Sequence, residues 1–365
     1  MPRKRNFDLL LLVTALIMMG IGVVMIYNAS AIIAVKKYGQ TSYHFLKMHL
    51  YHMVLAIVLL FAAMKSSYTV WKKWSPIILV LSFFTLLLVF FPHLGVKWGG
   101  ARRWIKMTPF FSFQPSELAK IAMIVFMASF LAKKKDSPGE LESISSPLFF
   151  ILGIFFVLIV AQPDLGTGAL IVMVVLTMFF VAGFRLRYLF VPILVFLCCL
   201  IVLILITPYR LNRITSHFDP WEDPRGSGYQ LIRSMVAIGS GGKMGVGLGN
   251  AVQNGITIPE PFTDFIFAII GKEVGLVGTC LVVCLFFLIA WRGLRIAMHC
   301  EDFFGFYLAT GITCLICYQG LINMGVVTGL LPTKGITLPF ISYGGTSLVF
   351  NALGIGILLN VSQYT

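Results

Sequence analysis

Long apolar runs repeat along this 365-residue chain, and they restrict its fold more than any other feature. Most approach the ~20 residues that an α-helix needs to cross a bilayer, and polar segments separate them. Lipid admits only helices and closed barrels, and runs of this length are helical. The sequence therefore predicts an all-α, polytopic membrane protein with ten transmembrane helices, at 7–27, 46–64, 75–92, 115–132, 147–162, 167–184, 188–207, 264–290, 303–324 and 343–361.

The composition agrees with a membrane protein and gives no support to nucleic-acid binding. The chain is 58% hydrophobic and 12% charged, whereas soluble domains are about 45–50% apolar and about 25% charged. Its net charge of +14 does not indicate nucleic-acid binding, because the cytoplasmic loops of membrane proteins are basic for reasons of topology. No nucleic-acid-binding motif is present either. We therefore expect the membrane, and no nucleic acid, as a partner.

Basic residues near the N-terminus set the expected orientation. Arg3, Lys4 and Arg5 precede the first apolar run, and positive residues keep such an end in the cytoplasm. Ten spans then bring the C-terminus back to the cytoplasm. We expect a single domain over 1–365, in which residues 207–262 form a large extracytoplasmic loop between helices 7 and 8.

The stretch 256–275 places a single carboxylate, Asp264, at the start of an apolar helix that is expected to continue to Trp291. Pro259 and Pro261 keep the approach extended. Two interpretations remain open: Thr263 or Asp264 caps the first turn, or Asp264 is a functional acid. At about 100° per residue, the acid shares one face with small residues, a strip that permits close packing or leaves a groove. These residues are Ala268, Gly271, Gly275 and Gly278.

Two charges lie within the fourth apolar run. Glu117 and Lys120 are three residues apart and therefore share one helix face. An unpaired charge is costly in lipid, so we expect them to form a structural pair. The alternative is that Lys120 binds an anionic headgroup. Arg102, Arg103 and Lys106, just before this run, fit that task better because guanidinium groups bind phosphate in bidentate fashion.

Two short segments contain turn residues. Asp164, in the Ala161–Thr167 turn, is expected to cap the following helix. The glycines of Gly239–Asn250 offer backbone N–H groups to phosphate, or they form a flexible loop. A Walker A loop is excluded, because Lys243 is followed by Met244 instead of Ser or Thr.

The segment 323–347 cannot be one continuous helix, because it holds several prolines and glycines. Lys334 lies at the tip of this re-entrant loop. Ser342 has no histidine or second acid at a recognisable spacing, so a serine nucleophile is not indicated.

Seven short motifs, taken in order, resemble one family, the SEDS proteins (shape, elongation, division, sporulation) of bacterial cell-wall synthesis. The resemblance covers all ten expected spans and is closer to the division members than to the elongation members. Two positions depart from the family pattern: Phe262 replaces a common histidine, and Lys272 a common acid. The motifs are Arg103-Trp104, Gln114-Pro115-x-Glu117-x-x-Lys120, Gln162 to Thr167, Gly228-Tyr229-Gln230, Pro259-Glu260, Thr263 to Ala268, and Pro339-x-x-Ser342-Tyr343-Gly344-Gly345.

The resemblance implies a peptidoglycan glycosyltransferase that polymerises lipid II, an undecaprenyl-pyrophosphate-linked disaccharide peptide, on the outer face of the bacterial cytoplasmic (inner) membrane. Asp264 matches the family's essential aspartate and would act as general base. The substrate-binding cations would be Arg102, Arg103, Lys106, Lys120, Lys243 and Lys334, and the supporting residues Glu117, Asp164, Glu260, Thr263 and Ser342. No cofactor is certain, and a divalent cation, Mg²⁺ or Mn²⁺, would help to stabilise the leaving pyrophosphate.

The implied partners are a class B penicillin-binding protein, which is a transpeptidase, and other proteins of the division machinery. Three alternatives stay open: an elongation polymerase, a lipid II flippase, and a scaffold that recruits division enzymes. Intramembrane charges suit a transporter as well. A flippase needs a polar path through the bilayer, whereas this sequence concentrates its polar residues on one side, which favours the enzyme.

Overall fold

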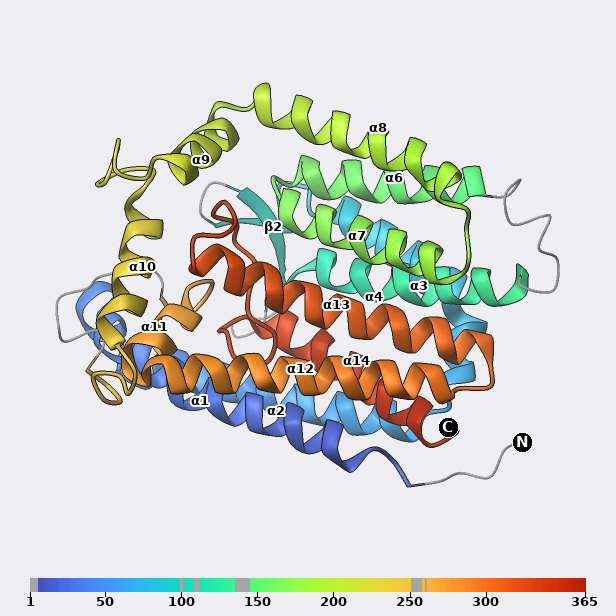
Figure 1. The fold of residues 1–365 in the computed structure, drawn as a ribbon, viewed down its shortest axis with the longest axis horizontal. Helices are drawn as coiled ribbons and strands as arrows, with labels where there is room; N and C mark the ends of the chain where they lie inside the picture. Colours follow the sequence, from blue (N-terminus) through green and yellow to red (C-terminus); the bar gives the residue numbers. More distant parts are fainter. Residues whose placement is uncertain (1–5, 99–100, 108–111, 135–144, 251–257, 260) are drawn as a thin grey trace.

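The computed structural model describes residues 6–98, 101–107, 112–134, 145–250, 258–259 and 261–365, and helices dominate it (Figure 1). Eight helices in this part of the chain are long and apolar enough to cross a membrane, and α6 and α7 are shorter apolar helices. The predicted all-α membrane fold is confirmed, while the count of ten spans stays a prediction. The long helices are α1 (Leu9–Tyr38), α2 (His44–Lys65), α3 (Tyr68–Leu88), α4 (Pro115–Lys134), α8 (Leu186–Leu205), α12 (Gly275–His299), α13 (Phe303–Val327) and α14 (Gly345–Ser362). The shorter ones are α6 (Ser145–Ala161), α7 (Leu165–Val181), α9 (Pro208–Phe218), α10 (Tyr229–Gly241) and α11 (Ile266–Glu273).

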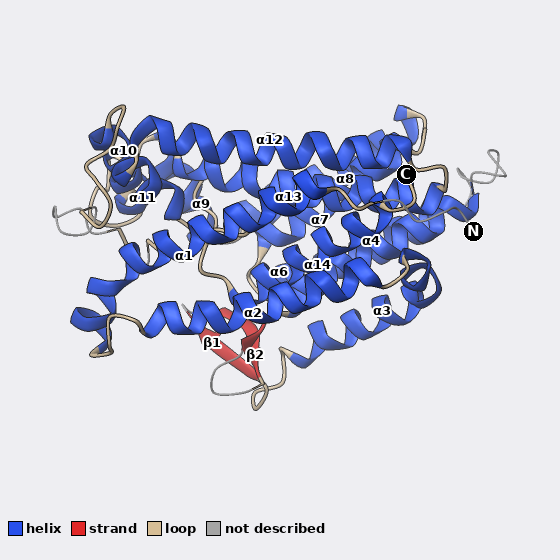
Figure 2. Ribbon diagram, turned by 90° about the horizontal axis from the view of Figure 1, so that it is seen from below, coloured by secondary structure: helices blue, strands red, loops and turns tan. Residues whose placement is uncertain are grey.

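A small antiparallel sheet connects α3 to α4, and the sequence did not predict it. Its strands, β1 (Gly95–Trp98), β2 (Ala101–Lys106) and β3 (Ser112–Phe113), lie in the order β1-β2-β3. Val96 pairs with Trp104 across the first two strands, and β-branched and aromatic residues of this kind favour strands. Figure 2 shows the sheet at the edge of the helical bundle.

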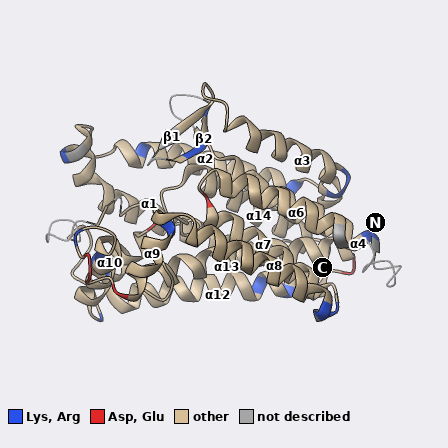
Figure 3. Cartoon of the chain, turned by 90° about the horizontal axis from the view of Figure 1, so that it is seen from above, with Lys and Arg blue, Asp and Glu red and all other residues tan. Residues whose placement is uncertain are grey.

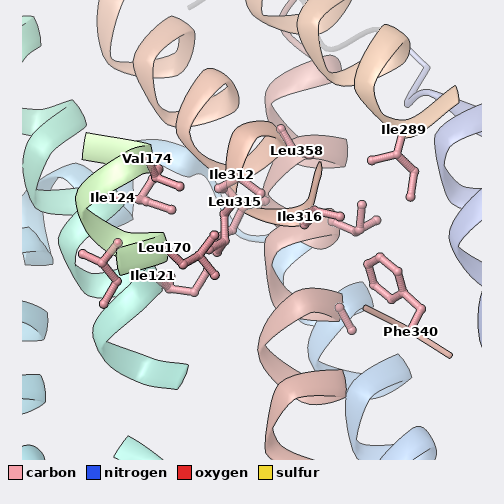
Figure 4. Packing of buried hydrophobic residues seen from close by; sticks show 14 of the residues in the cluster. Ile121, Ile124, Leu170, Val174, Ile289, Ile312, Leu315, Ile316, Phe340 and Leu358 are labelled. Carbon is pink, nitrogen blue, oxygen red and sulfur yellow. The ribbon is translucent and has the colours of Figure 1, made fainter. Parts of the chain in front are cut away.

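The core lies where α4, α7, α13 and α14 meet. Ile124 of α4 and Val174 of α7 pack toward Leu315 of α13, and Phe340 lies on the other side of α13 with Ile289 (Figure 4). By contrast few residues of α8 are buried. Since α8 is apolar all round, its exposed surface suits contact with lipid.

Both termini lie at one end of the bundle, which we call the terminus end (Figure 1). Buried polar contacts fasten it. Asp8 caps α1 by accepting from Leu11 N at 3.0 Å, and it also accepts from Arg292 Nε at 2.8 Å. Asn360 of α14 donates to Met64 O at 2.8 Å and accepts from Tyr68 N at 2.7 Å. Charged residues lie mainly toward the two ends of the bundle (Figure 3).

The predicted continuous helix 264–290 is wrong, because the helix is interrupted at Val274, between α11 and α12. Gly275, at the break, has a left-handed φ of +71°, a conformation that glycine adopts without steric cost. The opposite end of the bundle, which we call the far end, holds this break together with α9 and α10 (Figure 1). The predicted interruption between the last two spans is confirmed, since residues 328–344 are not helical.

The glycine-rich segment 239–250, here called the glycine clasp, explains the break. Its carbonyls at Gly242 and Lys243 accept from the first α12 amides, those of Leu276 (3.0 Å) and Val277 (3.3 Å). Its amides at Val246 and Gly247 donate to the last α11 carbonyls, those of Lys272 (2.9 Å) and Glu273 (3.1 Å). Helix ends carry unsatisfied groups of these two kinds. The amides of Val246 and Gly247 are therefore engaged in structural hydrogen bonds and are not available to a phosphate. Phosphate binding by the rest of the segment stays a prediction.

Candidate active site

Asp264 lies at the far end, two residues before α11 begins. The sequence placed Thr263 or Asp264 at the N-cap of this helix, which is wrong: the N-cap residue is Phe265, whose side chain makes no capping hydrogen bond. Asp264 is half-buried. A Cβ added to Gly335 would lie 3.0 Å from its Oδ2, so the carboxylate lies against the loop that joins α13 to α14. Glycine at 335 permits this close approach.

The same loop carries Lys334, which is half-buried beside the start of α7. A Cβ on Gly166 would lie 3.8 Å from Lys334 Cδ. Arg213 of α9 donates from Nη1 to the carbonyl of Thr333 at 3.0 Å, which ties the loop to α9. Burial lowers the pKa of the Lys334 ammonium. The structure therefore places a desolvated cation one residue from the glycine that contacts Asp264.

Arg103 holds the turn before α7. Its guanidinium donates to the carbonyl of Gln162 at 3.1 Å and to that of Pro163. Successive side chains on a strand point to opposite faces, so β2 turns Arg102 and Lys106 away from the face that presents Arg103. The three cations that are close in the sequence are therefore divided between two faces of the sheet. Some of the N–H donors of Arg103 are already bonded to backbone carbonyls.

Asp164 caps α7, as the sequence predicted. Its Oδ1 accepts from Thr167 N at 3.3 Å, and the side chain is buried. Its Oδ2 lies 3.4 Å from Gln114 Nε2 and 3.5 Å from Ser116 Oγ. The acid thus joins the start of α4 to the start of α7.

The Glu117–Lys120 pair is present in the interior, as predicted. Lys120 Nζ lies 2.8 Å from Glu117 Oε2, and both side chains are buried. Lys120 also donates to Gln319 Oε1 at 2.8 Å. Gln319 Nε2 in turn donates to the carbonyl of Thr337 at 3.0 Å. Gln319 therefore connects the Glu117–Lys120 pair to the loop that carries Lys334. Lys120 is buried beneath this loop and is not exposed at the surface.

The remaining predicted residues lie in varied surroundings. Lys106 and Lys243 are exposed, and Thr263 is half-exposed. Ser342 is buried, and its hydroxyl accepts from Leu338 N at 2.9 Å, which shapes the turn before α14. Glu260 lies outside the described residues.

A divalent cation finds few ligands here. In the described part of the chain, no three His, Cys, Asp or Glu side chains come together. Mg²⁺ is commonly held by one or two carboxylates, water and substrate phosphates. Asp264 is the carboxylate that such a site would use beside the Lys334 loop.

Three residues that shape this site were not predicted from the sequence: Arg213, Gln319 and Asn323. Gln319 and Asn323 are four residues apart in α13 and bond to consecutive residues of the Lys334 loop, Thr337 and Ile336. Polar side chains inside an apolar span are costly and often functional. That signal was available, but it did not reveal what the two amides bind.

These features define a multi-pass membrane protein with one acid facing a lysine-bearing loop at one end of its bundle. The family model for cell cycle proteins of the FtsW, RodA and SpoVE type matches residues 8–365. The chain belongs to this family, which confirms the resemblance to SEDS proteins.

Similar proteins agree along the full length. Stage V sporulation protein E of Bacillus subtilis strain 168 is 44% identical over 363 residues, covering 100% of this chain and 99% of that protein. The probable peptidoglycan glycosyltransferase FtsW of Geobacter sp. strain M18 is 42% identical, covering 99% and 98%. A chain from a structure described as the coordination of polymerization and crosslinking by a peptidoglycan synthase complex has a TM-score of 0.80 at 25% identity, covering 98% and 97%.

Proposed function

We propose that this protein is a peptidoglycan glycosyltransferase that polymerises lipid II at the outer face of the cytoplasmic membrane, at the division septum. Full-length relatives that are named FtsW peptidoglycan glycosyltransferases support the activity and the division role. The far end is the outer end in this proposal, and both termini are cytoplasmic. Basic residues at the terminus-end helix ends, including Lys65, Lys73 and Arg295, support this orientation through the positive-inside rule.

The observation that carries the proposal is the half-buried Asp264 carboxylate against the Lys334 loop. In the reaction, the 4-hydroxyl of the acceptor sugar attacks the anomeric carbon of the donor. Asp264 takes the hydroxyl proton as general base. The bond from the anomeric carbon to the lipid pyrophosphate breaks, and the anomeric centre is inverted. A pyrophosphate leaving group needs charge stabilisation more than protonation.

Lys334 is the cation best placed to stabilise that charge, because it is held close to Asp264 in a partly desolvated position where electrostatic contacts are stronger. Arg102, Lys106 and Lys243 complete the proposed phosphate-binding set at the same end. Arg103 and Lys120 do not contact the phosphates in this proposal. Arg103 positions the turn before α7, and Lys120 positions the Lys334 loop through Gln319. A divalent cation bound by Asp264 and the pyrophosphate would add Lewis-acid stabilisation.

We also propose that the protein works with a cross-linking class B penicillin-binding protein and other division proteins. The similar fold from a complex that coordinates polymerization and crosslinking supports the first partner.

The test is polymerisation of lipid II by purified Asp264→Asn. Asparagine keeps the shape but takes up no proton near neutral pH, so the rate should fall by the ~10²–10⁴-fold that general bases usually contribute. Asp223→Asn is the matched control. Its exposed carboxylate accepts from Gly226 N at 3.0 Å, and asparagine can still accept there. A fully active Asp264→Asn protein would refute the base. Transport of lipid II without polymerisation, even with the partner present, would favour a flippase.

A further inference from the structure

Asn323, near the end of α13, joins two separate parts of the candidate active site. Its Nδ2 donates to the backbone carbonyl of Asp264 at 2.8 Å and to that of Ile336 at 2.6 Å. The side chain is 1% exposed. One buried amide therefore connects the residue that carries the carboxylate to the loop that carries Lys334.

The chemistry of the neighbours fixes the orientation of this amide. Both are carbonyl oxygens, which accept only, so the NH₂ group and not the oxygen must face them. Asn323 Oδ1 has no hydrogen-bond partner among the residues that the structure describes. A buried acceptor without a partner is unfavourable, so the position of this side chain follows from its two donated bonds.

Another backbone contact joins the same two segments farther from the two charged residues. Tyr343 N donates to Phe262 O at 2.8 Å, which joins them two residues before Asp264 and well after Lys334. Asn323, by contrast, bonds to Asp264 itself and to a residue two positions from Lys334. It therefore joins the backbone of the acid to the backbone of the loop next to the cation.

We propose that Asn323 is a positioning residue that holds Asp264 at its working distance from the Lys334 loop. The proposal rests on the proposed function, in which Asp264 is the general base. A reacting group displaced by about 1 Å can lose on the order of 10²-fold in rate. Asn323 does not touch substrate and acts through the backbone of Asp264.

Lys334 has further contacts that do not involve Asn323. Arg213 bonds to Thr333 O, and Gly166 lies beside the lysine side chain. Loss of the Asn323 amide should therefore displace the base while leaving this cation near its place. We expect Asn323→Leu to lower kcat by about 10- to 100-fold and to leave the KM for lipid II within a few-fold.

A double-mutant cycle separates positioning from simple destabilisation. In an Asp264→Asn background, where no base remains to be placed, adding Asn323→Leu should cause no further loss of rate, measured at high enzyme concentration. Asn360→Leu is the matched control. It removes an equally buried amide that joins segments at the terminus end, and its rate per folded molecule should stay at the parental value.

Folding is checked by melting temperature and by retained lipid II binding. If Asn323→Leu does not fold, Asn323→Ser takes its place; its shorter hydroxyl reaches at most one carbonyl, and the same cycle applies. Parental kcat in the single variant, or losses that multiply in the double variant, would overturn the positioning role. Parental activity of Asp264→Asn would instead refute the general base, whatever Asn323 does.

Discussion

At the scale of single residues, Asp264 and Lys334 are both half-buried, so each keeps some contact with water. An acceptor hydroxyl can therefore approach the Asp264 carboxylate. Lys334 packs beside Gly166, and burial lowers the pKa of its ammonium group. Desolvation disfavours the charged form of a lysine, and a negative substrate would restore the balance by pairing with it.

This shift predicts a pH dependence for polymerisation. Because the pKa of Lys334 is lowered, its charge is lost below the usual lysine value of about 10.4 as the pH rises. We expect the rate to fall over that alkaline range. Lys334→Arg keeps a charge there, since guanidinium groups stay protonated, and should move the fall to higher pH.

The pH–rate profile of each purified variant measures this effect. Lys65→Arg, at the exposed end of α2 on the opposite end of the bundle, is the control and should leave the profile unchanged. An identical alkaline limb in the parent and in Lys334→Arg would show that another group titrates.

At the scale of elements, the glycine clasp converts one expected span into two helices. The clasp amides and carbonyls satisfy the end of α11 and the start of α12 at once. The strip of small residues serves the same packing: a Cβ on Gly241 would lie 2.0 Å from Gly271 O, so α10 and α11 approach closely. Short α11 thus directs Asp264 toward the Lys334 loop.

The clasp predicts a large cost for Gly275→Ala. Its φ of +71° disfavours a side chain by about 1–2 kcal/mol, and a Cβ would also lie 2.5 Å from Gly245 N. Gly183→Ala isolates the first effect, because Gly183 has φ +85° with no atom within 4 Å of its Cβ position. Thermal unfolding in detergent should show a clearly larger loss for Gly275→Ala. Equal melting temperatures would argue against the clasp.

At the scale of the whole molecule, the two ends of the bundle differ: one holds structural contacts and the other holds the candidate active site. The terminus end is fastened by Asp8, Arg292 and Asn360, whereas the far end holds the acid, the cations and the loops that place them. An enzyme that meets its substrate at one membrane face needs this asymmetry.

The orientation is testable by cysteine labelling in a variant without its seven native cysteines. Ser227→Cys, an exposed position before α10, should react with an impermeant maleimide in intact cells whose outer barrier is open. Lys73→Cys, on α3 at the terminus end, should react only after the inner membrane is lysed. The reverse pattern would invert the proposed topology.

Local sequence determined the membrane class and several contacts within one or two turns. Apolar runs must be helical in lipid, Asp164 caps the helix that follows it, and Glu117 meets Lys120 because they are three residues apart. Each of these depends on neighbours within about four residues, which helix geometry fixes. The family motifs also singled out Asp264.

Tertiary structure decided what those motifs contact. Asn323 and Asp264 are 59 residues apart, and Arg103 reaches a turn at the same separation. Gly275 ended a helix that hydrophobicity alone would continue, because the clasp supplies partners from a distant segment. Such contacts depend on how whole elements pack, which no local pattern encodes. The sequence therefore specified a membrane bundle with a conspicuous acid, and the packing set that acid against the Lys334 loop.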